Sequence, residues 1–430
     1  MKNITLLFAL MLMSTHFLLS KILHVPQEYL TIQSAINAAH NSDTILISEG
    51  MYYENIRYYG KGIVVASNYM YTKDWHTVQN TIINGSTCVN KDTASTVQFL
   101  DREDSTAILD GFTITGGTGT LWISGANKMI DGGGIFLNKS SATIRNNIIT
   151  NNMAQTGAGG GIGSLSTNPT IENNVIFSNT SWDAGGLMLD SGKVRNNIIY
   201  HNTTVIQGGG VIIFQAPQNS AIVENNIIAG NVSTTSAAGG ISIWVTDATT
   251  IPVVKNNIVW GNRQAAGGQI DYPQYITSYN DVEDYSSGTN IAVFPQLQEG
   301  SFLLSPTSPC IDAGDPSALY NDIENPSNLG MALPPSKGTV RNDIGAYGGF
   351  FAKALSLLDV SDFRLSSSSI SLQCSTSCQK TAGIELLNLS SKSLTIDSVT
   401  VSDTATFSLN KNFAGQTFIL LSFDSIKITF

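Results

Sequence analysis

A short asparagine-rich motif recurs through the middle of the chain and limits its fold more than any other feature. An Asn-Asn pair followed by β-branched or aromatic residues returns at steps of 27, 23, 29 and 31 residues. The copies are ATIRNNIITNN (142–152), TIENNVIFSN (170–179), KVRNNIIYHN (193–202), IVENNIIAGN (222–231) and VVKNNIVWGN (253–262). A repeat of this length that has no room for a 10-residue helix predicts short strands separated by Asn and Gly turns.

A second, glycine-led motif lies between the asparagine pairs. Its copies are GGGIFLN (132–138), GGGIGSL (159–165), GGLMLD (185–190), GGGVIIF (208–214), GGISIW (239–244) and GGQIDY (267–272). Each repeat therefore carries strand segments that cannot bury their apolar side chains alone. Stacked coils about 4.8 Å apart share one core, so the sequence predicts an all-β parallel β-helix.

The repeat also predicts which side chains face inward. Two apolar rows are expected in the core: Ile148, Val175, Ile198, Ile227 and Ile258, and Ile135, Ile162, Leu187, Val211 and Ile241. The first residue of each asparagine pair is expected in the left-handed conformation, where the side chains stack as an amide ladder. These residues are Asn146, Asn173, Asn196, Asn225 and Asn256.

The residue before each asparagine pair carries a charge, and its sign alternates from coil to coil. The series is Asp110, Arg145, Glu172, Arg195, Glu224 and Lys255, with Asp110 as its least certain member. Alternation avoids like-charge stacking in adjacent in-register strands. We therefore interpret these charges as structural.

The N-terminal region carries two signals. Residues 1–20 combine Met1-Lys2-Asn3 with a short apolar stretch, which predicts a signal peptide and a secreted or cell-surface protein. An uncleaved anchor is the alternative, and no later segment is long and apolar enough to span a bilayer. In TIQSAINAAH (31–40), apolar residues share one helical face, which predicts a helix capping the open core.

At this point the chain resembles a known family. VPQEYLTIQSAINAAHNSDTILISEGMYYENI (25–56), GKGIVVAS, NTIINGS, LDGFTITGG and the repeated coils resemble secreted bacterial right-handed parallel β-helix proteins of the pectin-lyase-like superfamily. FLLSPTSPCIDAGDP (302–316) and RNDIGAYGG (341–349) resemble their C-terminal cap. The resemblance covers residues 22–350 and implies a right-handed solenoid with end caps. It does not imply one activity, because the fold serves lyases, hydrolases, esterases and adhesins.

Residues 355–430 form a different region, rich in Ser and Thr with strand-like alternation. This region resembles a partial immunoglobulin-like β-sandwich of the hydin type, apparently truncated at Phe430. Cys374 and Cys378 are close enough to bridge within a hairpin. Cys88 and Cys310 lie near opposite ends of the large domain and are expected not to pair.

Composition excludes several partners. The formal net charge is −10 and only 13% of residues are charged, which argues against nucleic acid or an anionic membrane. We expect a monomer. No zinc-type His/Cys spacing occurs, so no metal or other cofactor is predicted. Calcium in DAGDP (312–316) is the alternative to a simple cap turn, but no motif supports it.

Candidate catalytic residues are few. Aligned on the last glycine of each coil, Asp131 and Asp183 share a row with Ala158 between them, and Asp190 lies four residues past its glycine. A pair made by Asp183 and Asp190 could perform acid/base work. Solvated turn aspartates are the alternative that we favour. His201 occupies a turn row and is expected at the surface.

Aromatic residues give a stronger signal. One outward row contains Phe214, Trp244 and Tyr272, and a second contains Tyr200 and Trp260. Phe136, Met188, Ile212 and Ile270 are also expected to point outward. Such a strip suits the apolar faces of sugar rings. Self-stacking, or burial under loops or the tail, is the alternative.

Two functional hypotheses follow. The first is a non-catalytic extracellular protein that binds polysaccharide or a cell-surface glycan. The alternative is a polysaccharide lyase or glycoside hydrolase acting on pectin-like or other uronic-acid polymers, using Asp183, Asp190 and a cation such as Lys193 or Arg195. Alternating paired charges, rather than a charge cluster in one groove, favour the first.

Overall fold

The computed structural model describes residues 20–355 except 125–126, 216–220, 236, 246–250, 265–267, 272–277 and 299–300. Beyond residue 355 it describes the backbone of five strands only, 363–365, 383–388, 394–396, 418–420 and 425–429. Residues 1–19 of the predicted signal peptide, Tyr272, Cys374 and Cys378 lie outside the described residues.

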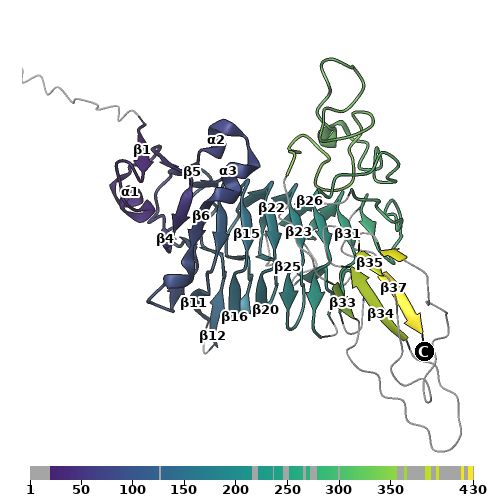
Figure 1. Cartoon of the computed structure of the whole chain (residues 1–430), viewed down its shortest axis with the longest axis horizontal. Coiled ribbons are helices and arrows are strands. Elements are labelled where there is room, and N and C mark those ends of the chain that lie inside the picture. The colour runs from purple at the N-terminus through teal and green to yellow at the C-terminus, as the bar shows by residue number, and fades with distance from the viewer. Residues whose placement is uncertain are drawn as a thin grey trace, which may run out of the picture.

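Three parallel sheets run along the solenoid, which is therefore the predicted parallel β-helix (Figure 1). The first sheet contains β1 (Ile22–Val25), β2 (Thr44–Ile47), β5 (Val64–Ser67), β9 (Ile108–Asp110), β14 (Thr143–Arg145), β18 (Thr170–Glu172), β22 (Gly192–Arg195), β26 (Ala221–Glu224) and β30 (Val253–Lys255). The second contains β3 (Gly50–Tyr52), β6 (Thr81–Asn84), β10 (Thr113–Thr115), β15 (Ile148–Thr150), β19 (Val175–Phe177), β23 (Ile198–Tyr200), β27 (Ile227–Ala229), β31 (Ile258–Trp260) and β32 (Asp281–Val282). The third contains β4 (Ile56–Arg57), β8 (Val97–Phe99), β13 (Ile135–Asn138), β17 (Ile162–Leu165), β21 (Leu187–Leu189), β25 (Val211–Gln215) and β29 (Ile241–Val245).

Smaller elements complete the coils. A four-stranded sheet contains β16 (Met153–Ala158), β20 (Thr180–Asp183), β24 (Thr203–Thr204) and β28 (Val232–Ser233). An antiparallel sheet contains β7 (Thr93–Ala94), β11 (Gly119–Ser124) and β12 (Asn127–Asp131). The helical elements are α1 (Ile32–Ala38), α2 (Tyr69–Thr72), α3 (Trp75–Asn80), η1 (Gly85–Thr87) and η3 (Ala318–Tyr320).

The predicted capping helix is confirmed as α1. The Thr31 side chain caps its first turn by accepting a hydrogen bond from the Ser34 backbone N–H. Ile32, Ala35 and Ile36 are buried against the core of the first coils. The helix therefore closes the end of the core that no further coil covers.

The predicted core is right for one row and wrong for the other. The row that begins at Ile135 points into the core, as expected. The row that begins at Ile148 points out of the coil, and the interior is filled instead by Ile149, Ile176, Ile199, Ile228 and Val259. The predicted pairing between coils is correct, but side chains alternate along a strand, so the residue after each predicted one faces the interior instead.

The asparagine pairs explain that difference. The first asparagine of each pair is left-handed, as predicted, with φ between 51° and 57°. The inward ladder, however, is made by the second asparagine. Asn174 Nδ2, for example, donates to Asn197 Oδ1 at 3.0 Å. The ladder contains Asn147, Asn174, Asn197, Asn226, Asn257 and Asn280.

The alternating charge row is confirmed, Asp110 included. Strand pairing places Asp110 beside Arg145, and the row continues in register to Lys255. Arg145 Nε donates to Asp110 Oδ2 at 2.9 Å, and Arg195 Nη2 donates to Glu172 Oε2 at 2.7 Å. These pairs act as links between neighbouring coils.

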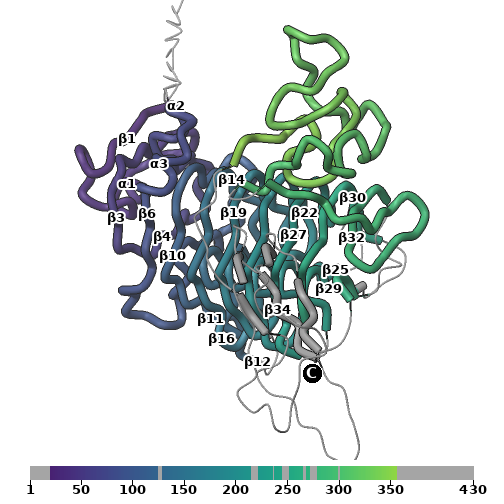
Figure 2. The backbone as a smooth tube through the Cα atoms, turned by 45° about the vertical axis from the view of Figure 1, so that its right-hand side comes forward, coloured from purple at the N-terminus to yellow at the C-terminus, as the bar shows by residue number. Residues whose placement is uncertain are grey.

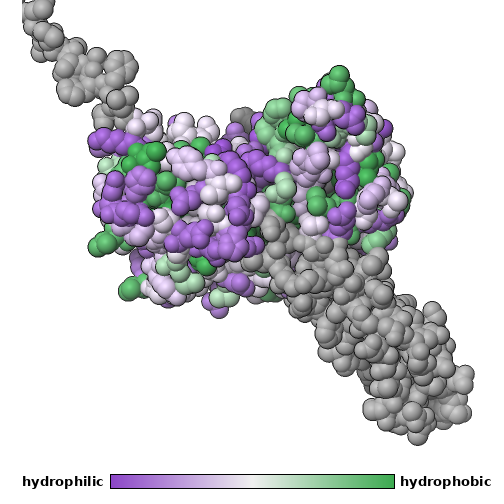
Figure 3. Space-filling model, turned by 45° about the horizontal axis from the view of Figure 1, so that its top comes forward, coloured by the Kyte–Doolittle hydropathy of each residue, from purple (hydrophilic) through white to green (hydrophobic). Residues whose placement is uncertain are grey.

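After the last coil the chain doubles back along the outside of the helix. We call residues 301–355 the return segment, shown in light green above the coils that carry β14 and β22 (Figure 2). Its Gly345 N–H donates to the Asn256 carbonyl oxygen at 2.8 Å. Its far end reaches α3, where Trp75 Nε1 donates to the Ala354 carbonyl oxygen at 2.8 Å. The return segment therefore crosses most of the coils and covers the outer face of the second sheet, and it contributes to the raised lobe at the upper right of the space-filling view (Figure 3).

The C-terminal strands are antiparallel. β34 (Gly383–Asn388) pairs with β33 (Phe363–Leu365) and with β37 (Ser425–Thr429), and β35 (Leu394–Ile396) pairs with β36 (Phe418–Leu420). The immunoglobulin-like sandwich and the domain boundaries stay predictions. Cys88 and Cys310 are both free thiols, as expected.

Candidate functional site

The outer face of the third sheet carries one exposed aromatic pair. Phe214 in β25 lies directly beside Trp244 in β29, with 6.2 Å between the ring centroids. They are 38% and 45% exposed, respectively. Trp244 Nε1 donates to Gln207 Oε1 at 3.0 Å, which fixes the indole ring. Both residues thus present aromatic surface to solvent on consecutive coils, as the sequence predicted.

The second predicted aromatic row does not form a surface, and this corrects the expectation for Tyr200. Tyr200 is fully buried, because its ring stacks on Phe177 and makes a T-shaped contact with Phe302 of the return segment. Trp260 is half-buried against Phe294, with ring centroids 6.0 Å apart. Burial under loops, one of the alternatives weighed from the sequence, therefore holds for this row, because Phe294 and Phe302 come from segments that follow the last coil and precede the C-terminal region.

The wider apolar strip is also less exposed than expected. Phe136, Met188 and Ile212 lie on the outer face of the third sheet but are buried in a small cluster with Trp122 packed against it. Ile270 belongs to the interior core, so its outward placement was wrong. Its backbone is joined to Ile241 only by an isolated bridge, where strand alternation is no guide.

Three aspartates lie along the same side of the solenoid. Ala158 pairs with Asp183 and donates its backbone N–H to Asp131 Oδ1 at 2.7 Å, so the predicted row of Asp131, Ala158 and Asp183 exists. Asp190 Oδ2 accepts the Ser166 backbone N–H at 2.6 Å. The Oδ1 atoms of Asp183 and Asp190 are buried without a hydrogen-bond partner.

Burial controls the protonation of these carboxyl groups. Burial, together with the charges of Asp183 and Asp190 and against the hydrogen bond from Ala158, raises the pKa of Asp131 to about 6. Burial likewise raises the pKa of Asp190 to about 6 and raises that of Asp183. These groups are therefore not the solvated turn aspartates that we favoured. Asp131 and Asp190 do accept the main-chain hydrogen bonds expected of turn residues.

Within the part of the chain that the structure describes, no three His, Cys, Asp or Glu side chains are arranged to hold a metal ion. In DAGDP, Asp312 accepts hydrogen bonds from Thr339, and Asp315 Oδ2 accepts one from Lys255 Nζ at 2.6 Å. Both carboxylates therefore hold the cap together.

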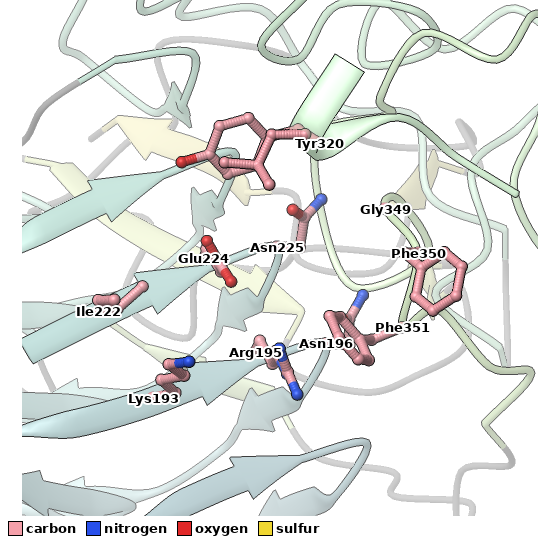
Figure 4. Close-up of a pocket in the computed structure, with 11 residues that line it drawn as sticks. Lys193, Arg195, Asn196, Ile222, Glu224, Asn225, Tyr320, Gly349, Phe350 and Phe351 are labelled. Carbon is pink, nitrogen blue, oxygen red and sulfur yellow. The ribbon is translucent and has the colours of Figure 1, made fainter. Parts of the chain in front are cut away.

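A cleft of about 260 Å³ lies between the first sheet and the return segment (Figure 4). One wall consists of outward residues of β22 and β26, including Lys193, Arg195 and Glu224. Tyr320, Phe350 and other residues of the return segment form the opposite wall. The outward direction of these charged residues could be predicted from the sequence, because side chains alternate along a strand. The cleft itself was missed because no sequence pattern indicates where the return segment lies.

Comparisons with known proteins bear on the family of this chain. No helix among the described residues is both long and apolar enough to cross a membrane. The crystal structure of pectate lyase Pel9A is similar with a TM-score of 0.37 and 11% sequence identity, over 77% of this chain and 97% of that chain. No curated protein matches this chain. The family model for the right handed beta helix region matches residues 53–282, more than half of the chain. The protein therefore belongs to the right-handed β-helix family.

Proposed function

We propose that this protein is exported and binds polysaccharide, without cleaving it, on the outer face of the third sheet. The Phe214–Trp244 pair is the observation that carries the proposal. Neighbouring coils are about 4.8 Å apart, so the two rings offer adjacent apolar platforms along one line. Exposed aromatic surface of this kind typically marks a binding site. The export part of the proposal rests on the N-terminal pattern of residues 1–20.

The surroundings of the aspartates favour binding over catalysis. Asp131 and Asp190 are 2% and 7% exposed, and each accepts a main-chain hydrogen bond. A general acid must come within hydrogen-bond reach of the bond that it cleaves. The enclosed carboxyl groups of Asp131 and Asp190 are poorly placed to come within hydrogen-bond distance of a bond in a polysaccharide.

A second candidate function, polysaccharide hydrolysis or elimination, has one observation in its favour. Carboxyl groups with a pKa near 6 can donate and accept protons at mildly acidic pH. If these aspartates become accessible to a bound chain, Asp183 and Asp190 are the residues that would act. Hydrolysis or elimination would release shortened polysaccharide products, whereas binding alone would release none.

One experiment separates the two candidates. Purified protein is screened against neutral and acidic polysaccharides by affinity electrophoresis, and each mixture is assayed for new reducing ends and for unsaturated uronide absorbance. We expect retardation by at least one polymer, loss of retardation in Trp244→Ala and Phe214→Ala, and no products. Tyr71→Ala is the matched control, because Tyr71 is 60% exposed on α2 and lies outside the pair. Products that disappear in Asp183→Ala would instead establish the enzyme.

A further inference from the structure

The cleft of Figure 4 contains two charged side chains whose charged atoms form no hydrogen bond with the described residues. Lys193 is exposed and makes no hydrogen bond or ion pair with any described residue. The Glu224 carboxylate likewise accepts no hydrogen bond from the described part of the chain, although it is half-buried and lies between Arg195 and Lys255 of the neighbouring strands. Burial raises the pKa of Glu224, while the positive charges of Arg195, Lys193 and Lys255 oppose that rise.

The other cations around the cleft are already neutralised. Arg195 donates to Glu172 and lies 3.3 Å from the centre of the Phe351 ring. Lys255 is paired with Asp315 and lies 4.6 Å from the centre of the Tyr320 ring. Among the described residues that line the cleft, the charged groups whose hydrogen-bonding atoms are still available to a ligand are therefore one cation, Lys193, and one anion, Glu224. Their charges cancel.

The opposite wall supplies apolar surface. Phe350 lines the cleft and is 64% exposed, while its neighbour Phe351 is occupied by Arg195. The volume of about 260 Å³ is slightly below the roughly 300 Å³ at which pockets for drug-sized ligands begin. The space thus suits one small ring with polar groups on its edge.

We propose that this cleft binds one unit of a neutral saccharide. Glu224 accepts hydrogen bonds from adjacent sugar hydroxyl groups, Lys193 donates to a sugar oxygen, and Phe350 packs on the apolar face of the ring. A uronic acid fits less well, because its carboxylate would meet Glu224 in a partly buried site. This site is on a different sheet from the Phe214–Trp244 pair and does not depend on the function proposed for that pair.

Binding of small neutral sugars tests the proposal. Lactose, cellobiose and xylobiose are the neutral probes and digalacturonate is the acidic one, measured by saturation-transfer NMR and titration calorimetry on the full chain. We expect at least one neutral probe to bind more tightly than digalacturonate. Glu224→Gln should weaken that binding about tenfold or more, since it removes a charged acceptor. Phe350→Ala should weaken it several-fold without affecting the fold, because Phe350 is mostly exposed.

Trp244→Ala is the control that separates this site from the polysaccharide surface. It should leave binding of the neutral probe unchanged even where it abolishes polymer retardation. The proposal is overturned if no neutral probe binds, if digalacturonate binds more tightly, or if Glu224→Gln and Phe350→Ala both bind as the unaltered protein does. Melting curves of each variant confirm that the fold is intact.

Discussion

The side chain of Asn196 donates a hydrogen bond of 2.7 Å to the backbone carbonyl oxygen of Gly348, a residue 152 positions later. Asn196 can do this because its left-handed backbone turns the side chain out of the coil. Asn225 makes the same kind of contact with Asp343 and Gly345, and Asn146 accepts a hydrogen bond from Lys353. The turn residues of the repeat therefore also attach the return segment.

The two asparagines of one pair should differ in their effect on stability. Asn196→Gly keeps the left-handed turn and loses only the hydrogen bonds to Ala346 and Gly348, so we expect a loss of about 1–3 kcal/mol. Asn197→Ala should cost more, about 3–5 kcal/mol, because it also leaves two buried donors of Asn174 without their acceptor. Urea denaturation measures both. Equal losses would show that the ladder is not the main stabilising element.

The repeats made the β-helix predictable, because evenly spaced turns and β-branched segments allow few other folds. The strand register was correct as well: the charge row from Asp110 to Lys255 lies in one line. The facing of the second sheet was wrong for a physical reason. One left-handed asparagine at the turn decides which of two adjacent isoleucines points inward, and composition alone does not reveal it.

The candidate site was less predictable than the fold. Phe214 and Trp244 were found because alternation holds within β25 and β29. Tyr200 obeys the same alternation but is covered by Phe302, which lies about a hundred residues later and belongs to no repeat. Long-range covering of this kind leaves no periodic trace. The cleft beside Glu224 was missed for the same reason.

Replacement of Tyr200 and of Phe214 should lower the free energy of unfolding by very different amounts. Tyr200→Ala creates a cavity beneath the return segment, so we expect it to lower the free energy of unfolding by about 3–5 kcal/mol. Phe214→Ala removes an exposed ring and should cost less than about 1 kcal/mol. Chemical denaturation distinguishes the two variants. A stable Tyr200→Ala protein would mean that the return segment does not cover the second sheet in solution.

Reversing the sign of the charge at the centre of the charge row should lower the stability of the protein. Arg195→Glu places three carboxylates side by side on β18, β22 and β26, so we expect a loss of about 3–5 kcal/mol. Lys193→Met on the same strand removes an exposed charge and should change stability by less than about 0.5 kcal/mol. Added salt should partly restore Arg195→Glu, because it screens like charges. If salt has no effect, the loss comes from the Phe351 contact rather than from charge.

Stability should fall as the pH rises toward 8, because two carboxyl groups of the return segment, those of Asp322 and Asp343, are buried. Burial raises the pKa of Asp322 to about 8, with a further contribution from the charge of Asp343, and burial raises the pKa of Asp343 to about 7. The unfolded chain releases these protons near the ordinary aspartate pKa of 3.8, whereas the folded protein keeps them to higher pH. Between about pH 4 and pH 8 the folded state therefore binds more protons, and the free energy of unfolding decreases as pH increases.

Asp322→Asn removes the penalty of charging a buried carboxyl group and should raise stability at pH 8 by on the order of 2 kcal/mol, with little change at pH 4. Denaturation at several pH values checks both statements, and Asp104→Asn is the control, because hydrogen bonds to Thr106 lower the pKa of that exposed carboxyl group. A slope that is the same in Asp322→Asn and in the unaltered protein would show that Asp322 is already charged in the folded state.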